Sequence, residues 1–325
     1  HVSDKYGGPE YESIAGFGSN CGVDDLKVVA KANEICDRYT IDTITAAAMI
    51  SGTLECAQKG LLPDHMTEGL DLRFGSAEGV LDLLNLIVQQ KGLGAVLAKG
   101  PREAIRQLGE ETTDCFLHVK GQPLPFQEPR WKTGMGIGYA LSPTGAEHMA
   151  NIHDVLYADF EAPTFAAASN MGILKATGTL ELNRDKARLW AYMGINRSIH
   201  NVVCLCSFMP YSFEQIVEMI QAVTGWNVSS WELMKISERC LNMARWFNAR
   251  EGMTSSDDTL PERCFQPLKG GALEGQAIES NQFHKVVAST YEMLGWDRET
   301  GVAHTGKLNE LGLGWLLDGR SGSQT

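Results

Sequence analysis

The sequence predicts a mainly α-helical protein made of two domains. Apolar residues recur at helical spacing over most of the chain, Ser and Asp precede several of these segments, and strand-like alternation is scarce. The chain has 325 residues, enough for about two domains of ordinary size. These observations favour helices with buried apolar faces over a fold built on a sheet.

The first half of the chain contains four expected helices. After Asp25, the apolar residues Leu26, Val29 and Ala32 begin a pattern with a period close to 3.6 residues. A second apolar segment follows at once and is stopped near Gly60. The expected helices are 25–39, 42–56, 78–90 and 101–108.

Two helices are expected in the second half because their start signals are explicit. Ser212 and Gln215 have the spacing of a capping box, and the apolar residues that follow end at Gly225. Ser229 and Glu232 repeat the start signal and open a longer helix with one apolar face.

The character of the sequence changes between residues 112 and 143, where proline and glycine accumulate. Linkers between domains concentrate such residues. We therefore place a domain boundary at Leu117, which gives one helical domain of residues 1–117 and another of residues 118–325.

Gly134, Gly136 and Gly138 alternate with other residues in a way that invites a nucleotide-binding interpretation. A dinucleotide fingerprint needs a strand before it and a helix after it, whereas a proline-rich segment precedes these glycines. The favoured interpretation is a tight loop whose backbone approaches another surface closely.

Charge and composition exclude several classes of function. The net charge of −12 argues against non-specific binding to nucleic acid or to an anionic membrane. No apolar run reaches 18 residues, so no transmembrane helix is expected. The eight cysteines form no recognisable disulfide framework, which favours a reducing cytoplasm. The polar end 319–325 is expected to fray.

Glu12 and three histidines are candidates for proton transfer. Glu12 follows a glycine-proline turn, where a carboxylate is ordinarily solvated or a cap, although one beside a metal could exchange a proton. His148 is expected near the start of a helix. It competes with His153 and His200, and spacing does not choose among the three.

Cysteine and aspartate residues supply candidate ligands. Cys204 and Cys206 are separated by one residue, whereas an iron–sulfur cluster usually needs four thiolates. Cys206 could therefore be only the distant fourth ligand of a site whose other ligands lie elsewhere. Asp37 and Asp42 flank the end of the first expected helix. Asp42 suits an N-cap, and both carboxylates could also accept the N–H groups of a pterin.

Longer stretches, in this order and at these spacings, resemble a known family. They are Gly7–Ser13, Asn20–Leu26, Lys31–Glu34, Ile41–Ile44, Lys120–Gln122, Glu128–Arg130, Gly138–Ala140, Gly145–His148, Thr224–Trp226, Phe247–Gly252, Asp257–Arg263 and Leu294–Asp297. They look like the second and third domains of the tungsten-containing aldehyde ferredoxin oxidoreductase family, which includes a branch of benzoyl-CoA reductase tungsten subunits. The resemblance spans essentially the whole chain and implies two helical domains of that C-terminal type.

The resemblance also implies two cofactors, a tungsten bis-pyranopterin (tungstopterin) and a [4Fe-4S] cluster. In the family, a D-x-x-G-[LI]-[DC] motif in each domain binds a pterin. Here Thr40 and Cys204 stand in the two glycine positions. Asn201 replaces the second aspartate, and its neutral amide forgoes a charge-assisted hydrogen bond. The cofactor-binding residues that carry over are Asp37, Ile41, Asp42, Asn201, Leu205 and Cys206.

Further roles follow from the same resemblance. Glu12 and His148 match the pair that transfers protons beside the metal, and Cys206 matches the fourth ligand of the [4Fe-4S] cluster. The N-terminal pterin-binding domain and the other three cluster cysteines are missing from this chain. Cys21, nine residues after Glu12, is a candidate tungsten ligand in the benzoyl-CoA reductase branch, although a buried loop cysteine is the favoured interpretation.

Three functions remain open from the sequence. The leading hypothesis is the C-terminal part of an enzyme that oxidises a small aldehyde to a carboxylic acid and passes electrons to ferredoxin or another electron-transfer subunit. The first alternative is the tungsten subunit of an ATP-independent benzoyl-CoA reductase acting on an acyl-CoA. The second is a non-catalytic helical assembly domain. Under the enzyme hypotheses, Glu12, Asp42, His148 and Cys206 should line one cleft.

Overall fold

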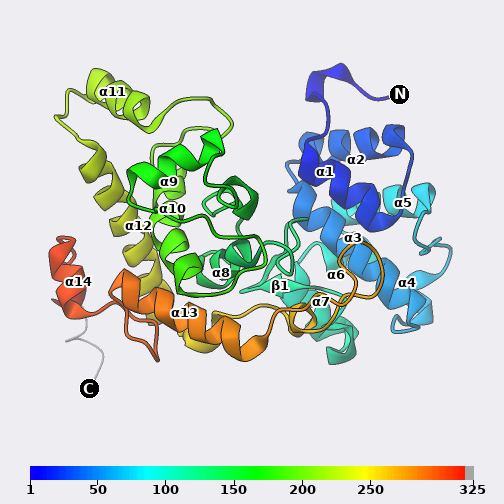
Figure 1. The fold of residues 1–325 in the computed structure, drawn as a ribbon. Helices are drawn as coiled ribbons and strands as arrows, with labels where there is room; N and C mark the ends of the chain where they lie inside the picture. Colours follow the sequence, from blue (N-terminus) through cyan, green and yellow to red (C-terminus); the bar gives the residue numbers. More distant parts are fainter. Residues whose placement is uncertain (319–325) are drawn as a thin grey trace. The chain divides into compact units, whose positions relative to one another are not determined.

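The computed structural model describes residues 1–318 and consists mainly of helices (Figure 1). Helices account for 57% of the chain, which confirms the predicted mainly α fold. The end 319–325, which was expected to fray, lies outside the described residues. Within the described part of the chain, no helix combines the length and the apolar character needed to cross a bilayer.

The chain divides into two compact units. Unit 1 comprises His1–Glu128, Thr144–Ala146 and Pro261–Arg263, and unit 2 comprises Pro129–Pro143, Glu147–Leu260 and Cys264–Thr325. The predicted boundary after Leu117 lies inside the first stretch of unit 1. The residues that follow it form the hairpin of strands β1 (His118–Val119) and β2 (Gln122–Pro123), and β2 packs against a helix of unit 1.

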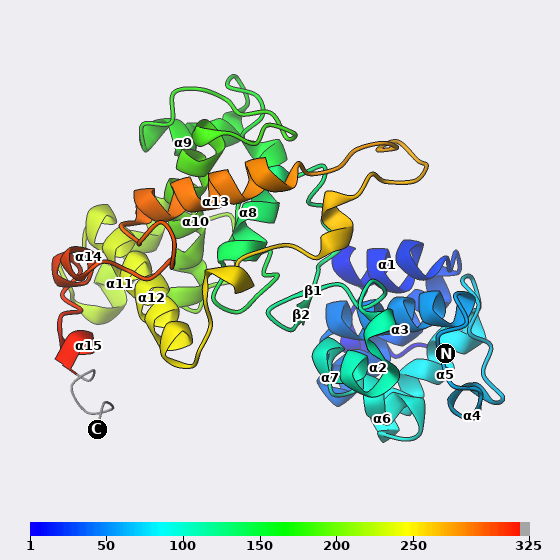
Figure 2. The same cartoon turned by 90° about the horizontal axis from the view of Figure 1, so that it is seen from below.

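Unit 1 is a cluster of short helices around an apolar core. Helix α3 packs against α1, and α5 packs against α2 and α6 (Figures 1 and 2). The start of α3 is set locally, since the Asp42 carboxylate accepts a hydrogen bond from Thr45 N at 2.7 Å. The helices are α1 (Tyr11–Phe17), α2 (Leu26–Tyr39), α3 (Thr43–Gln58), α4 (Asp64–Thr67), α5 (Ala77–Gln89), α6 (Leu93–Leu97) and α7 (Pro101–Leu108).

Unit 2 is built around its longest helices. Helix α10 packs against α8, α12 and α13. The predicted capping box is present, with Gln215 N donating to Ser212 Oγ and the Gln215 side chain accepting from Ser212 N. The helices are α8 (Thr133–Leu141), α9 (Ala166–Asn170), α10 (Arg184–Val202), α11 (Phe213–Thr224), α12 (Ser230–Arg250), α13 (Ser280–Leu294), α14 (Thr305–Glu310) and α15 (Trp315–Asp318).

The alternating glycines do not form a loop, and that part of the prediction was wrong. They lie in the buried helix α8. A Cβ at Gly138 would lie 1.9 Å from Asn151 Oδ1, and one at Gly134 would lie 2.5 Å from Ile152 Cδ1. The expected close backbone approach is therefore real, but a helix makes it, because tertiary packing outweighs the low helix propensity of glycine.

Candidate functional site

The two motif segments, 37–42 and 201–206, fold into the same turn. In the first, Thr40 N donates to Asp37 O at 3.4 Å and Ile41 N donates to Cys36 O at 2.9 Å. These are the bonds of a helix that ends in a left-handed residue, and Thr40 has a φ of 56°. A β-branched residue is strained in this region, which glycine would enter freely.

The second segment repeats that geometry at the end of α10. Cys204 N donates to Asn201 O at 3.3 Å, Leu205 N donates to His200 O at 2.8 Å, and Cys204 has a φ of 56°. Positions 40 and 204 thus both adopt a left-handed conformation that glycine enters freely, although neither is glycine. The short sequence echo between the segments therefore corresponds to one backbone structure used twice.

Each turn presents polar side chains to the outside while an apolar residue anchors it. Asp37, Asp42, Asn201 and Cys206 are exposed. One oxygen of each aspartate accepts a hydrogen bond, Asp37 from Asn33 Nδ2 at 3.0 Å and Asp42 from Thr45 N of the α3 backbone at 2.7 Å. The other oxygen of each carboxylate is available to N–H donors of a ligand. The anchors are Ile41, which packs on the core of unit 1, and Leu205, which packs on an apolar cluster of unit 2.

Glu12 lies in α1 of unit 1 and is held firmly. Its Oε2 accepts a hydrogen bond from Phe126 N at 2.8 Å, and its Oε1 accepts one from Gln127 Nε2 at 2.9 Å. The neighbouring Tyr11 hydroxyl donates to Phe126 O at 3.0 Å. The carboxylate therefore has a fixed orientation, and it joins two segments more than a hundred residues apart in sequence.

His148 lies in a non-helical turn of unit 2, so the expectation that it begins a helix was wrong. The turn is closed by Glu147, whose carboxylate oxygens accept hydrogen bonds from Met149 N and Ala150 N, both at 2.6 Å. The His148 ring lies edge-on to that of His153, with centroids 6.5 Å apart. Local side-chain capping has replaced the helix here.

The environments of the competing histidines differ. Burial, together with the charges of Lys132, Arg197 and His148, lowers the pKa of His153 to about 4. Burial also lowers the pKa of His200, which lies on the second motif turn. His153 is therefore neutral at pH 7 and poorly suited to carrying a proton near neutrality.

Cys21 is fully enclosed in the core of unit 1. Burial raises the pKa of its thiol to about 12, so the thiol rather than the thiolate is present at neutral pH. This environment is that of a packing residue.

Comparison with known proteins identifies the relationship. A family model described as aldehyde ferredoxin oxidoreductase, domains 2 and 3, matches residues 1–313. The chain belongs to the aldehyde ferredoxin oxidoreductase family. The resemblance of its motifs is thereby confirmed at the level of the whole chain.

Several curated relatives are tungsten-containing aldehyde ferredoxin oxidoreductases. The chain is 28% identical to that of Pyrococcus abyssi over 313 residues, covering 94% of this chain and 49% of the relative, and 27% identical to that of Thermococcus kodakarensis over 315 residues. It is also 26% identical over 321 residues to the aliphatic sulfonate oxidoreductase, WOR-like subunit, of Pyrococcus furiosus, covering 94% of this chain and 46% of that relative. The chain thus spans about half the length of the curated relatives it matches.

One solved structure is similar in fold. It is the active site complex BamBC of benzoyl coenzyme A reductase, with a TM-score of 0.72 and 19% identity, covering 96% of this chain and 50% of that one. This match, too, involves half of a longer protein.

The residues of the two aldehyde ferredoxin oxidoreductase motifs suit a pterin but supply little for a metal cluster. The exposed carboxylate oxygens at the turns are acceptors of the kind that pterin N–H groups need. Among residues 1–318, no group of three or more His, Cys, Asp or Glu side chains is arranged to hold a metal ion. Cys206 would supply one thiolate of the four that a [4Fe-4S] cluster requires, so the others must come from outside this chain.

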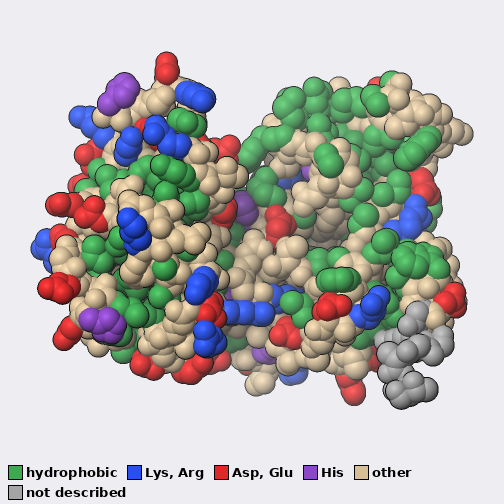
Figure 3. Space-filling model, turned by 180° about the vertical axis from the view of Figure 1, so that it is seen from behind, with side chains coloured by type: hydrophobic (Ala, Val, Ile, Leu, Met, Phe, Trp, Pro, Cys, Tyr) green, Lys and Arg blue, Asp and Glu red, His purple; other side chains and the backbone are tan. Residues whose placement is uncertain are grey.

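A groove of about 410 Å³ lies next to the second turn in unit 2. It is lined by apolar residues of α10, α11 and α12 and includes Leu205 of the motif. Figure 3 shows hydrophobic side chains gathered over the end of unit 2 that carries α11, where Val223 and Trp226 are among the most exposed apolar residues.

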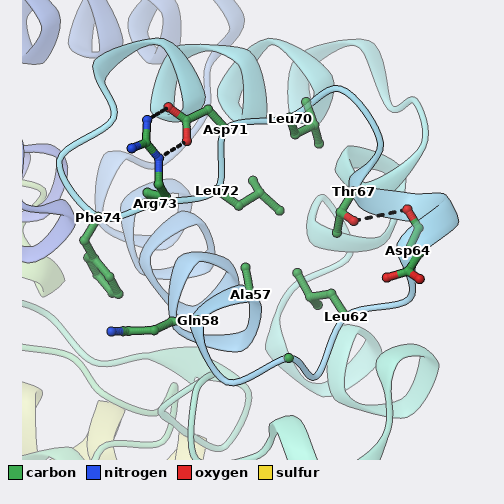
Figure 4. Close-up of a pocket in the computed structure, with 11 residues that line it drawn as sticks. Ala57, Gln58, Leu62, Asp64, Thr67, Leu70, Asp71, Leu72, Arg73 and Phe74 are labelled. Atoms are coloured by element: carbon green, nitrogen blue, oxygen red, sulfur yellow. Dashed lines mark hydrogen bonds and ion pairs between the residues drawn. The ribbon is translucent and has the colours of Figure 1, made fainter.

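Unit 1 has a separate hollow of about 630 Å³ between the end of α3, α4 and the segment that follows α4 (Figure 4). Its floor is apolar, with Ala57 and Leu72. At its rim Asp71 accepts two hydrogen bonds from Arg73, at 2.6 and 2.8 Å. The guanidinium is thereby neutralised, and the hollow lacks an unpaired charge from this pair to attract an ion.

Sequence reasoning missed the buried ion pair beneath α8. Asp154 accepts hydrogen bonds from Gly134 N and Met135 N, both at 2.9 Å, and pairs with Lys186, whose Nζ also donates to Gly178 O at 2.9 Å. Both charged side chains are fully buried. No local pattern announces such a pair, because its members are 32 residues apart in sequence.

Proposed function

We propose that this chain is the C-terminal part of a tungsten-pterin, iron–sulfur oxidoreductase that oxidises aldehydes to carboxylic acids with ferredoxin as the electron acceptor. The observation that carries the proposal is the structural equivalence of the two motif turns. Each turn holds its exposed polar residues at a strained helix end, and the family match extends over both units. Backbone strain of this kind is concentrated at functional sites.

The residues of this chain have defined parts in that reaction. When bound, tungstopterin supplies the two-electron redox chemistry. Asp37, Asp42 and Asn201 would orient it by accepting hydrogen bonds from pterin N–H groups at their side-chain oxygens. Cys206 would bind one iron of the [4Fe-4S] cluster through its Sγ.

Glu12 and His148, which match the family's catalytic pair, would transfer the protons. Glu12 would hold or release a proton at a carboxylate oxygen whose position is set by Phe126 N and Gln127. His148 would do so at a ring nitrogen, in a turn made rigid by Glu147. We propose that the protein works in the cytoplasm and that the missing N-terminal domain completes the cofactor site.

Benzoyl-CoA reduction, with an acyl-CoA substrate and Cys21 on tungsten, is the alternative enzyme function. The complete burial and raised pKa of Cys21 support the aldehyde branch instead. The two are separated by replacing Cys21 with alanine in the full-length protein. Aldehyde-dependent dye reduction should persist in the variant if the thiol only packs in the core. Loss of both the activity and the bound tungsten would favour the alternative.

The cluster assignment is tested by Cys206→Ser in the full-length protein. This variant should lose iron and the EPR signal of the reduced cluster, because a serine oxygen ligates iron poorly. Cys204→Ser is the matched control, since it changes a thiol on the same turn and should retain both. Equal loss in the two variants would contradict the assignment. Absence of iron together with absence of aldehyde oxidation in the unaltered protein would favour a non-catalytic assembly domain.

A further inference from the structure

Two cysteines of unit 1 lie together far from the motif turns in sequence. Cys56 is in the last turns of α3, and Cys115 follows the short 3-10 turn Glu110–Thr112. Both are free thiols, and the backbone of Cys115 packs on α3 one turn before Cys56, since a Cβ at Gly52 would lie 2.7 Å from Cys115 O. Cys56 is fully buried, and Cys115 retains 6% of its surface exposed.

A cation is held against the less buried sulfur. Lys59 Nζ lies 3.6 Å from Cys115 Sγ and pairs with Glu55 at 2.9 Å. Arg263 pairs with the same glutamate at 2.7 Å and donates to Asp114 O at 3.1 Å, which ties the loop carrying Cys115 to α3. Glu55 thus holds the ammonium group of Lys59 beside Cys115.

The pKa values of the two thiols are shifted in opposite directions. The hydrogen bond from Cys56 lowers the pKa of Cys115 against the effect of burial, and Lys59 adds to the lowering. The same hydrogen bond and burial raise the pKa of Cys56. Cys115 therefore has the character of a nucleophilic thiolate and Cys56 that of a protonated partner.

We propose that Cys115 is a peroxide-reactive site and that Cys56 resolves it by forming a disulfide. The Cys115 thiolate attacks one oxygen of hydrogen peroxide. The O–O bond breaks, the departing oxygen takes a proton from Lys59 and leaves as water, and the sulfur becomes a sulfenic acid. Cys56 then attacks this sulfur, the S–O bond breaks, and the hydroxyl leaves with the Cys56 proton as a second water. Lys59 regains its proton from solvent. Overall, two thiols and one peroxide give one disulfide and two waters.

The burial of Cys56 and Cys115 favours a small oxidant. A sulfur with 6% of its residue exposed admits a molecule of the size of water more readily than a disulfide such as oxidised glutathione. The product would join α3 to the loop after α7, closing a loop with 58 residues between positions 56 and 115. Because Asp42 of the first motif turn caps α3, the cross-link would fix the far end of the helix that follows this turn.

The test uses the full 325-residue chain in its reduced form. The chain is exposed to hydrogen peroxide, then denatured and alkylated, and its peptides are mapped without reduction. We expect a peptide pair joined through Cys56 and Cys115, which dithiothreitol separates. In Cys56→Ser, Cys115 should stop at the sulfenic acid and be labelled by dimedone. In Cys115→Ser, neither the joined pair nor a label at Cys56 should appear.

Two further variants separate a reactive site from simple proximity. Lys59→Met keeps the length of the side chain but removes its charge, and it should slow formation of the joined pair roughly threefold or more by lowering the thiolate fraction. Cys36→Ser is the matched control, because burial raises the pKa of this other thiol of unit 1 to about 12, and the variant should leave the rate unchanged. If Cys56 and Cys115 both remain alkylatable in the unaltered chain while exposed Cys204 is oxidised, the proposal is wrong. An unchanged rate in Lys59→Met would overturn it as well.

Discussion

Replacing Thr40 with glycine should stabilise unit 1, even though it shortens a side chain beside a proposed cofactor site. Thr40 has a φ of 56° at the end of α2, and its side chain makes no hydrogen bond among the described residues. The left-handed conformation costs a residue with a Cβ about 1–2 kcal/mol. Glycine avoids this penalty.

The size of the gain follows from two opposing terms. Relief of the Cβ penalty contributes about 1–2 kcal/mol, and the greater flexibility of glycine in the unfolded chain takes back about 0.5–1 kcal/mol. The net gain should be about 0.5–1 kcal/mol. Gln90→Gly is a matched control, because Gln90 ends α5 with a φ of 51° and the same hydrogen bonds, away from both motifs.

The reverse substitution checks the sign of the effect. Gly60 closes the same kind of turn after α3 with a φ of 67°, and a Cβ there would meet no atom within 4 Å. Gly60→Ala should therefore lose about 1 kcal/mol through conformation alone.

The assay must distinguish the units. All seven tryptophans lie in unit 2, so tryptophan fluorescence reports the unfolding of that unit. Urea-dependent hydrogen exchange of peptides from α2 and α3 reports unit 1 directly. Thr40→Gly should increase protection in these peptides and leave the fluorescence midpoint unchanged. A loss of protection in Thr40→Gly, with a gain in Gln90→Gly, would show that the threonine side chain contributes more than its strain costs.

Three other perturbations have defined outcomes. Burial lowers the pKa of His153 to about 4. The unfolded chain therefore takes up its proton first, and the stability of unit 2 should be complete above about pH 6.5 and fall toward pH 4 by about 2 kcal/mol after allowance for partial exposure. His153→Gln should remove this dependence in tryptophan-monitored urea titrations, and an unaltered profile would contradict the assignment. Lys186→Met should cost about 3–5 kcal/mol in the same titrations by leaving Asp154 buried and unpaired, whereas a cost below about 1 kcal/mol would mean that the pair is hydrated. Glu12→Gln places an amide NH₂ against the N–H of Phe126 or the side-chain amide of Gln127. The variant should lower the protection of α1 in hydrogen exchange by about 1–3 kcal/mol. Unchanged protection would show that this anchor is dispensable.

Features set by near neighbours in sequence were predicted well. The starts of α3 and α11 were expected at Asp42 and Ser212, and the structure confirms both because a cap is made by a side chain within three residues of the N–H it accepts. The mainly helical class followed from the same local periodicity.

Features that depend on distant partners were not predictable in this way. The turn around His148 was expected to be helical, but Asn151 is held from α10, where Trp190 Nε1 donates to Asn151 Oδ1 at 2.9 Å. The glycines of α8 were expected in a loop, because neither the packing of Asn151 against Gly138 nor the capping by Asp154 is visible locally.

The sequence by itself determined where several helices begin, the family of the chain, and the positions of the two motifs, because these depend on neighbouring residues and on order along the chain. Only the tertiary structure decided that Thr40 and Cys204 both take a left-handed conformation. It also decided that Cys115 lies against α3, with its sulfur beside Lys59. The physical reason is that backbone strain and thiol pairing are sustained by packing between segments remote in sequence, which no local pattern of residue types encodes.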